Sequence, residues 1–134
     1  MSRHKQHLIF TYGTLMRDEI NHRLLATARF VAEAQTEPCF ELFDLGHFPA
    51  MSAGGQTVVR GEIYAVDDQT LVRLDRLEGH PEFYQRTPIR LADGQEVQTY
   101  LMEDARMRRR PAIPSGDWRA RRARALGTEE CCWA

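Results

Sequence analysis

The chain has 134 residues, of which 43% are hydrophobic and 28% are charged, and its formal net charge is −1. This is the composition of an ordinary globular protein, and the length suits a single domain over residues 1–134 with flexible ends at 1–6 and 127–134. No apolar run approaches the roughly 20 residues that span a membrane, and the polar start of the chain lacks the apolar core of a signal peptide. We therefore expect a cytoplasmic protein without a membrane partner.

The first part of the chain predicts three strands and one helix. Residues 7–12 (HLIFTY) are a short apolar, β-prone run that stops at Gly13, which predicts a strand running into a tight turn. Residues 18–26 begin with two acids and predict a helix. The buried face of that helix is expected to hold Ile20, Leu24 and Leu25. Residues 28–34 predict a second strand, and residues 40–48 predict a third that passes into an irregular loop.

The second part predicts three more strands and two more helices. Residues 57–66 alternate between apolar and polar side chains and predict a strand. Asp67, followed by a second aspartate, is suited to cap a helix. The apolar stripe of this helix would be Leu71, Leu74 and Leu77. Strands over residues 84–91 and 96–102 are joined by an Asp-Gly turn of the kind that closes hairpins. Residues 115–126 predict a last helix.

Strands dominate this pattern, and they do not alternate with helices regularly enough for a doubly wound parallel sheet. Six or so short strands can curl into a small barrel or a strongly curved sheet. The sequence therefore predicts an α+β domain. Its expected architecture is a small mixed β-barrel or strongly bent sheet with two or three flanking helices.

The first candidate site is the segment Tyr12-Gly13-Thr14-Leu15, between the first strand and the first helix. Glycine lets the backbone turn sharply and approach a ligand closely. The amides that follow can form a concave donor set for a carbonyl oxygen, an oxyanion or a carboxylate. The alternative is a strand–helix corner that needs glycine for its turn alone, and the residues by themselves leave both interpretations open.

The second candidate site is Glu78, next to the apolar stripe of the predicted helix and just before the helix-ending residues Gly79 and Pro81. The C-terminal end of a helix is already negative, so a carboxylate is disfavoured there. An acid beside a buried stripe is a candidate for a raised pKa and for proton transfer. The alternative is an exposed glutamate that pairs with Arg76 or Arg86.

Other side chains of reactive types have simpler explanations. By alternation, Glu62 faces away from its strand neighbour Ile63, and Asp75 is expected on the helix surface. The three cysteines and five histidines show no disulfide or metal-ligand spacing. We therefore expect no metal site, and the role of the adjacent Cys131 and Cys132 stays open.

The charge is unevenly distributed along the chain. Residues 1–105 carry 10 Lys and Arg against 16 Asp and Glu, whereas residues 106–128 carry eight arginines against Asp117. Such a segment could meet phosphate or nucleic acid, or it could pair with the acidic body of its own domain. The arginines lack the series of interleaved aromatic residues that a base-stacking surface needs. We therefore favour pairing within the domain and do not expect a nucleic-acid partner. The oligomeric state and the role of residues 106–124 stay open.

Three motifs follow one another along the chain: Tyr12-Gly13-Thr14-Leu15 after a strand, Arg60-Gly61-Glu62-Ile63-Tyr64, and the run LDRLEGHPEFYQR from Leu74 to Arg86. Their order and spacing resemble the γ-glutamylcyclotransferase-like (AIG2-like) family over about residues 7–103. The resemblance implies a compact mixed barrel with flanking helices. It also implies a glutamyl-binding loop, a catalytic glutamate and a pocket-lining tyrosine. The corresponding residues are Tyr12, Gly13, Thr14 and Leu15 for the loop, Glu78 for the acid and Tyr84 for the tyrosine.

The resemblance further implies an enzyme that needs no cofactor. The α-amine of a γ-glutamyl substrate would attack its own γ-carbonyl and release 5-oxoproline with a free amine or amino acid. Glu78 would transfer the protons, and the amides from Gly13 to Leu15 would stabilise the oxyanion. Whether the released group is an amino acid, a lysine side chain or another amine stays open. The alternative is a non-catalytic binding module on the same fold that uses the Arg-rich segment.

Overall fold

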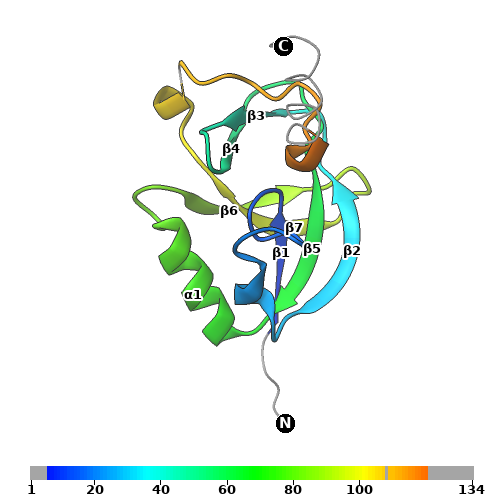
Figure 1. The fold of residues 1–134 in the computed structure, drawn as a ribbon. Helices are drawn as coiled ribbons and strands as arrows, with labels where there is room; N and C mark the ends of the chain where they lie inside the picture. The colour runs from blue at the N-terminus through cyan, green and yellow to red at the C-terminus, as the bar shows by residue number, and fades with distance from the viewer. Residues whose placement is uncertain (1–5, 108, 121–134) are drawn as a thin grey trace, which may run out of the picture.

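The computed structural model describes residues 6–107 and 109–120, and Figure 1 shows curved strands with one longer helix at their side. The expected flexible ends, apart from Gln6, lie outside these residues. The strands are β1 (His7–Thr11), β2 (Arg29–Gln35), β3 (Phe40–Asp44), β4 (Pro49–Ala53), β5 (Arg60–Val66), β6 (Gln85–Arg90) and β7 (Glu96–Leu101). The helices are α1 (Asp68–Glu78) and two 3-10 helices, η1 (His22–Leu25) and η2 (Asp104–Met107).

The strands form one mixed sheet in the order β2-β5-β1-β7-β4-β3, and β6 pairs with β7 beside this path. Both β1 and β4 run parallel to β7, and the other paired strands are antiparallel. The end strands β2 and β3 do not pair with each other in the described part of the chain, so the sheet stays open. The α+β class is confirmed, whereas the barrel form of the expectation is wrong.

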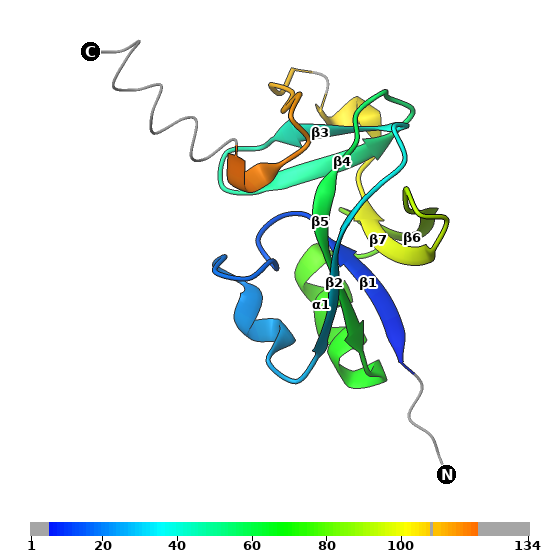
Figure 2. The same cartoon turned by 90° about the vertical axis from the view of Figure 1, so that its right-hand side faces the viewer.

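The sheet is weakest on either side of β7. β1 pairs with it only at Ile9 and Gln98, and β4 pairs with it only at Met51 and Leu101. In Figure 2, the β3–β4 pair crosses near the start of β5, and α1 lies beside the other end of β5. The sheet is therefore nearly divided on each side of β7, and this leaves room between the parts for side chains from the loops.

The helix α1 forms where the capping aspartate predicts it. The Asp67 side chain accepts a hydrogen bond from the Thr70 amide at 2.8 Å, which satisfies one of the unpaired N–H groups at the helix start. Leu71 and Leu74 are buried, and each contributes about 2 kcal/mol through removal of apolar surface from water. Leu77 is 43% exposed, so its predicted place in the buried stripe is wrong.

The predicted helix over residues 18–26 is also wrong. Asp18 has a φ of +68°, in the left-handed region, and a right-handed helix cannot pass through it. Only the short η1 forms, with Leu25 buried and Ile20 76% exposed. The helix expected over residues 115–126 falls largely outside the described residues, of which 118–120 are helical. Within the described residues, no helix has the length and hydropathy to cross a membrane.

Candidate active site

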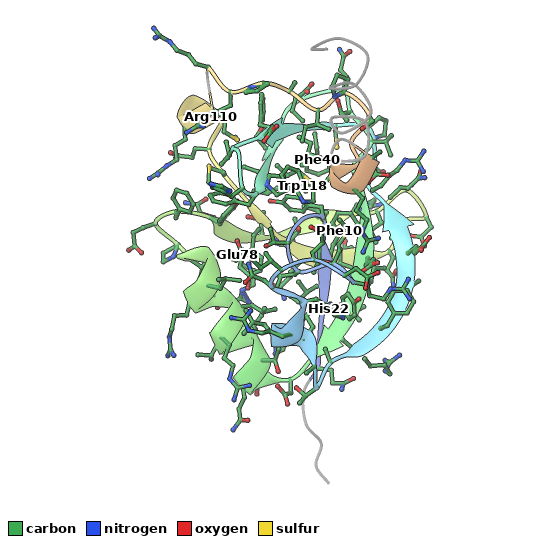
Figure 3. All side chains as sticks on the ribbon, viewed as in Figure 1. Phe10, His22, Phe40, Glu78, Arg110 and Trp118 are labelled. Carbon is green, nitrogen blue, oxygen red and sulfur yellow. The ribbon has the colours of Figure 1, made fainter. Side chains whose placement is uncertain are left out.

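A cavity of about 880 Å³ lies where the loop after β1, the end of α1 and the β3–β4 turn meet. All six residues singled out from the sequence line it: Tyr12, Gly13, Thr14, Leu15, Glu78 and Tyr84. Figure 3 shows Glu78 at the end of α1, with Trp118 of the C-terminal segment above it in this view. The fold therefore brings two motifs that are distant in the sequence to one place.

Glu78 is the last residue of α1 and is partly buried at the cavity. It follows Leu74 by four positions and Leu71 by seven, so it continues the stripe of α1 that faces the core. Burial raises the pKa of its carboxyl to about 7, because the carboxylate loses hydration when it ionises there. This group can therefore accept and return a proton near neutral pH.

The alternative interpretation gave Glu78 an arginine partner on the surface. Arg86 instead pairs with Asp75, with 3.1 Å between its Nε and the Asp75 Oδ1. Arg76 forms no ion pair among the described residues. No described side chain therefore neutralises Glu78, which agrees with desolvation as the cause of its raised pKa.

The loop after β1 presents its backbone to the same cavity. Within the described residues, no acceptor is found for the amides of Gly13, Thr14 and Leu15. The loop is braced on its other side, because Asn21 donates from its amide to the Thr14 carbonyl at 2.8 Å and from its side chain to the Thr14 hydroxyl at 3.0 Å. The three N–H groups are thus held in place and available to a ligand.

Packing against Pro49 requires glycine at position 13. A Cβ atom there would lie 2.6 Å from Cγ and 2.7 Å from Cδ of Pro49, both closer than atoms of packed side chains approach. The close approach that glycine permits is therefore to Pro49 at the start of β4. Gly13 does not have a positive φ, so packing against Pro49, and not the turn itself, requires glycine here.

Tyr12 and Tyr84 line the cavity with hydroxyl groups that are already bonded within the protein. The Tyr12 hydroxyl donates to the Tyr100 carbonyl at 2.6 Å and accepts from the Met51 amide at 3.2 Å. In a regular parallel pairing, the Met51 amide would donate directly to the Tyr100 carbonyl. The Tyr12 hydroxyl lies between these two groups, so it bridges the weak contact between β4 and β7. The Tyr84 hydroxyl donates to the Pro49 carbonyl at 2.7 Å.

Burial raises the pKa of both phenols above the ordinary tyrosine value, and the nearby Glu78 adds to the shift. Neither hydroxyl is therefore suited to act as a base. The two tyrosines are better placed to shape the cavity than to transfer protons.

Comparison with known proteins assigns the chain to a family. The model of the gamma-glutamyl cyclotransferase, AIG2-like family matches residues 9–120. The chain belongs to this family.

A putative gamma-glutamylcyclotransferase of Vibrio cholerae is 40% identical to this AIG2-like chain over 113 residues, which cover 84% of this chain and 96% of the relative. The human protein named gamma-glutamylaminecyclotransferase is 38% identical over 97 residues, 63% of this chain and 61% of its own. The crystal structure of an aig2-like protein from Mus musculus superposes with a TM-score of 0.75 at 30% identity, covering 85% of this chain and 90% of that one. The mixed α+β fold of this chain is thus similar to that of the mouse aig2-like protein.

The sequence patterns do not single out Tyr100 and Trp118, which also line the AIG2-like cavity. Tyr100 lines the cavity from β7 and donates its hydroxyl to Asp75 Oδ1 at 2.7 Å. Asp75 is therefore a half-buried, hydrogen-bonded acid and not the surface acid that was expected. Trp118 lines the cavity from the C-terminal segment and donates from Nε1 to Glu19 Oε1 at 3.2 Å. Thr99 and Tyr100 are both buried although they point to opposite faces of β7, so alternation could not have singled out Tyr100.

Proposed function

We propose that this chain is a γ-glutamyl cyclotransferase that converts a γ-glutamyl amide to 5-oxoproline and a free amine. The observation that carries the proposal is the pairing, in one cavity, of an unneutralised carboxyl with a pKa of about 7 and three backbone N–H groups without an acceptor among the described residues. The names of the Vibrio and human relatives support the same reaction class. Membership in a family does not by itself establish an activity, which depends on the site.

The reaction needs two proton transfers and no external nucleophile. The substrate's α-ammonium group loses a proton to the Glu78 carboxylate, and the resulting amine attacks its own γ-carbonyl carbon. The new C–N bond closes a five-membered ring, and the carbonyl electrons move to oxygen. As the second proton leaves the ring nitrogen, the departing nitrogen is protonated and its bond to carbon breaks. In total, two protons pass from the α-nitrogen to the leaving amine, and one carboxyl can carry both in turn.

The remaining tasks fall to the loop after β1 and to the cavity shape. The amides of Gly13, Thr14 and Leu15 would donate to the oxygen on which negative charge develops, which is the interaction that stabilises such intermediates most. The cavity would hold the glutamyl chain bent, so that nitrogen and carbonyl carbon lie within reach of each other. Tyr12 supports this arrangement because it ties the loop to β4 and β7.

The charges around the cavity favour one class of leaving group. The charged residues that line it in the described part of the chain are Asp18, Glu19 and Glu78, with no lysine or arginine among them. An acidic surrounding attracts a cationic amine and repels an extra carboxylate. We therefore expect γ-glutamyl amines to turn over faster than γ-glutamyl amino acids.

The test is release of 5-oxoproline from γ-glutamyl amino acids, γ-glutamyl-ε-lysine and γ-glutamyl amines. Glu78→Gln keeps the size of the side chain and removes its proton transfer, so kcat should fall by about 10²–10⁴-fold. Glu82→Gln is the matched control, because Glu82 is exposed, close in sequence and absent from the cavity wall. Near-normal turnover by Glu78→Gln would show that this carboxyl is not the acid–base group. A folded wild type that releases nothing across the panel would contradict the activity itself.

A further inference from the structure

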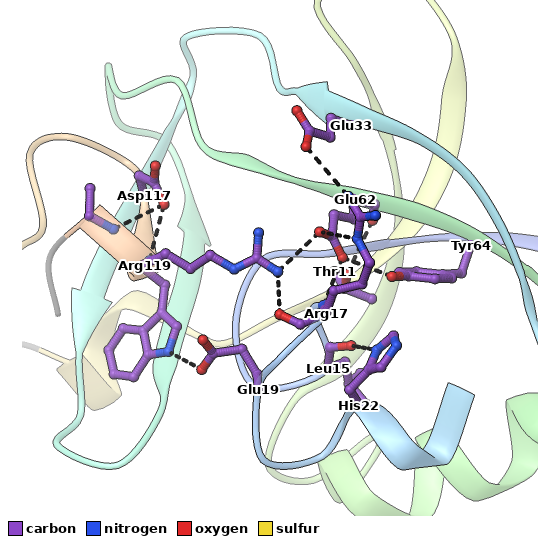
Figure 4. Close-up of polar contacts among 12 residues, drawn as sticks. Thr11, Leu15, Arg17, Glu19, His22, Glu33, Glu62, Tyr64, Asp117 and Arg119 are labelled. Carbon is purple, nitrogen blue, oxygen red and sulfur yellow. Dashed lines mark hydrogen bonds and ion pairs between the residues drawn. The ribbon is translucent and has the colours of Figure 1, made fainter. Parts of the chain in front are cut away.

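An ion cluster centred on the buried Glu62 lies behind the loop that follows β1. Its other members are Arg17, Arg119 and Tyr64, and both arginine side chains are partly exposed. Glu62 on β5 is only 1% exposed, and Figure 4 shows donors converging on its carboxylate. Its Oε1 accepts from the Arg17 amide at 3.0 Å and from the Tyr64 hydroxyl at 2.9 Å. Its Oε2 accepts from Arg17 Nε at 3.4 Å and from Arg119 Nη2 at 3.0 Å.

These contacts keep the buried carboxylate ionised. Burial by itself would raise the pKa of Glu62, but the hydrogen bonds from Arg17, Tyr64 and Arg119 outweigh it and lower the pKa below the ordinary glutamate value. Each oxygen has two donors, so the carboxylate is fully satisfied. Removing one partner of a buried charged group is costly, because the others are left without compensation.

The two arginine donors come from segments that lie far apart in the sequence. Arg17 belongs to the loop after β1, between the amides at Gly13–Leu15 and the lining residues 18–21. Arg119 belongs to the C-terminal segment, and its Nη2 also donates to the Arg17 carbonyl. Both the N–H and the C=O of Arg17 are therefore held, one by Glu62 and one by Arg119.

A second contact joins the same two segments. Trp118 Nε1 donates to Glu19 Oε1 at 3.2 Å, two residues along the loop from Arg17. The C-terminal segment thus holds the loop through hydrogen bonds from Trp118 and Arg119, and Glu62 holds it through hydrogen bonds from the sheet side. Arg17 is not part of the cavity wall, so these contacts reach the site only through the backbone of the loop.

We propose that Glu62 and Arg119 are positioning residues that hold the loop of residues 13–21 in the conformation that presents its amides to the substrate. This inference rests on the proposed function for its kinetic consequence. It assigns a role to one arginine of the Arg-rich C-terminal segment, and it makes that segment part of the working enzyme.

The test compares Arg119→Met with Arg119→Lys. Methionine keeps much of the apolar stem but cannot pair with Glu62, so kcat/KM per folded molecule should fall by about 10-fold or more. A lysine ammonium can still reach both the Glu62 carboxylate and the Arg17 carbonyl, so Arg119→Lys should recover to within about 3-fold of the wild type. Glu62→Gln should behave like Arg119→Met, because its amide nitrogen would face two arginine donors.

The matched controls are Arg90→Met and Glu96→Gln. Arg90 and Glu96 form an exposed ion pair on the β6–β7 hairpin, 3.8 Å between Nη2 and Oε2, and neither lines the cavity. Each control should leave kcat/KM unchanged. The low-pH limb of the rate profile should also stay in place in Arg119→Met, because Glu78 lies on α1 and not on the loop. If Arg119→Met keeps kcat/KM within about 2-fold, or if lysine fails to restore it, the positioning role is wrong.

Hydrogen exchange separates this inference from the proposed function. In Arg119→Met, the hydrogen-bonded amides of the loop should exchange about 10-fold faster than in the wild type, while those of α1 stay unchanged. The bonded amides are those of Met16, Arg17, Glu19 and Asn21. If the wild type shows no turnover but the loop loosens in this way, the proposed reaction is wrong and the positioning of the loop stands. Unchanged exchange in the loop would overturn the positioning, whatever the activity.

Discussion

At the scale of single residues, the site depends on where one carboxyl lies along its helix. Glu78 shares the stripe of Leu71 and Leu74, so the spacing that buries those leucines also removes water from the acid. It is also the last residue of α1, where the helix dipole disfavours negative charge. Both effects favour the protonated form, and the acid becomes suited to proton transfer near neutral pH.

Gly13→Ala should damage both the fold and the activity. The added methyl group meets the Pro49 ring at 2.6 Å, so either the loop or β4 must shift, at a cost of about 1–3 kcal/mol of stability. Because the amides of the loop move with it, kcat/KM should fall by about 10-fold or more. Thermal unfolding and 5-oxoproline release, measured on the same preparation, check the two effects.

The control for this change is Gly94→Ala. Gly94 has a φ of +90° in the β6–β7 turn, so alanine is strained there, but nothing lies within 4 Å of the new Cβ. It should cost about 1 kcal/mol of stability and leave turnover intact. Equal activities of the two variants would show that the cavity tolerates movement of the loop, and that Gly13 has a packing role alone.

At the scale of elements, local signals predict most of the fold. They find α1, the β6–β7 hairpin and the strands β1, β2, β3 and β5, and they fail for β4 and for residues 18–26. A capping aspartate and leucines at helical spacing are enough for α1, and the Asp-Gly turn is enough for the hairpin. The strand β4 (Pro49–Ala53) has no β-branched residue and was not predicted. It becomes a strand because β3 pairs along its whole length and β7 pairs with it at Met51.

Asp67→Ala should weaken α1 without affecting the chemistry. The lost bond to the Thr70 amide should lower the free energy of unfolding by about 1 kcal/mol. Urea unfolding at pH 7 measures this, with Gln69→Ala as an exposed neighbour that should stay within about 0.5 kcal/mol of the wild type. Since Glu78 lies at the other end of the helix, kcat at a temperature well below unfolding should not change. A large loss of kcat would mean that the position of Glu78 depends on the helix start.

At the scale of the whole molecule, two buried glutamates affect stability in opposite directions. The lowered pKa of Glu62 contributes stability above its unfolded-state pKa, and this contribution is lost on acidification through the folded-state value. The raised pKa of Glu78 works the other way. Between its unfolded-state pKa of about 4.3 and the folded value of about 7, the native state holds a proton that the unfolded state has released. Stability from this group therefore falls as the pH rises through that window.

Glu78→Gln should consequently be more stable than the wild type at pH 8, by about 1–3 kcal/mol, and nearly equal to it at pH 4. The physical reason is that glutamine never ionises in the cavity, whereas the wild type must bury a carboxylate at high pH. Denaturant unfolding at the two pH values measures the difference. A variant with the same stability as the wild type at both values would show that desolvation of Glu78 is not the cause of its raised pKa.

The sequence by itself determined the strands other than β4, the helix α1, the place of Glu78 at a helix end, and the motifs that identify the family. These depend on contacts between near neighbours, such as caps, turns and side-chain periods, which the sequence displays directly. Tertiary structure alone decided that the sheet stays open, that residues 18–26 make no full helix, and that Tyr100 and Trp118 share the cavity. It also decided that Glu62 is buried in an ion cluster. These outcomes depend on which distant segments pack together, because burial and pairing come from partners that no local pattern specifies.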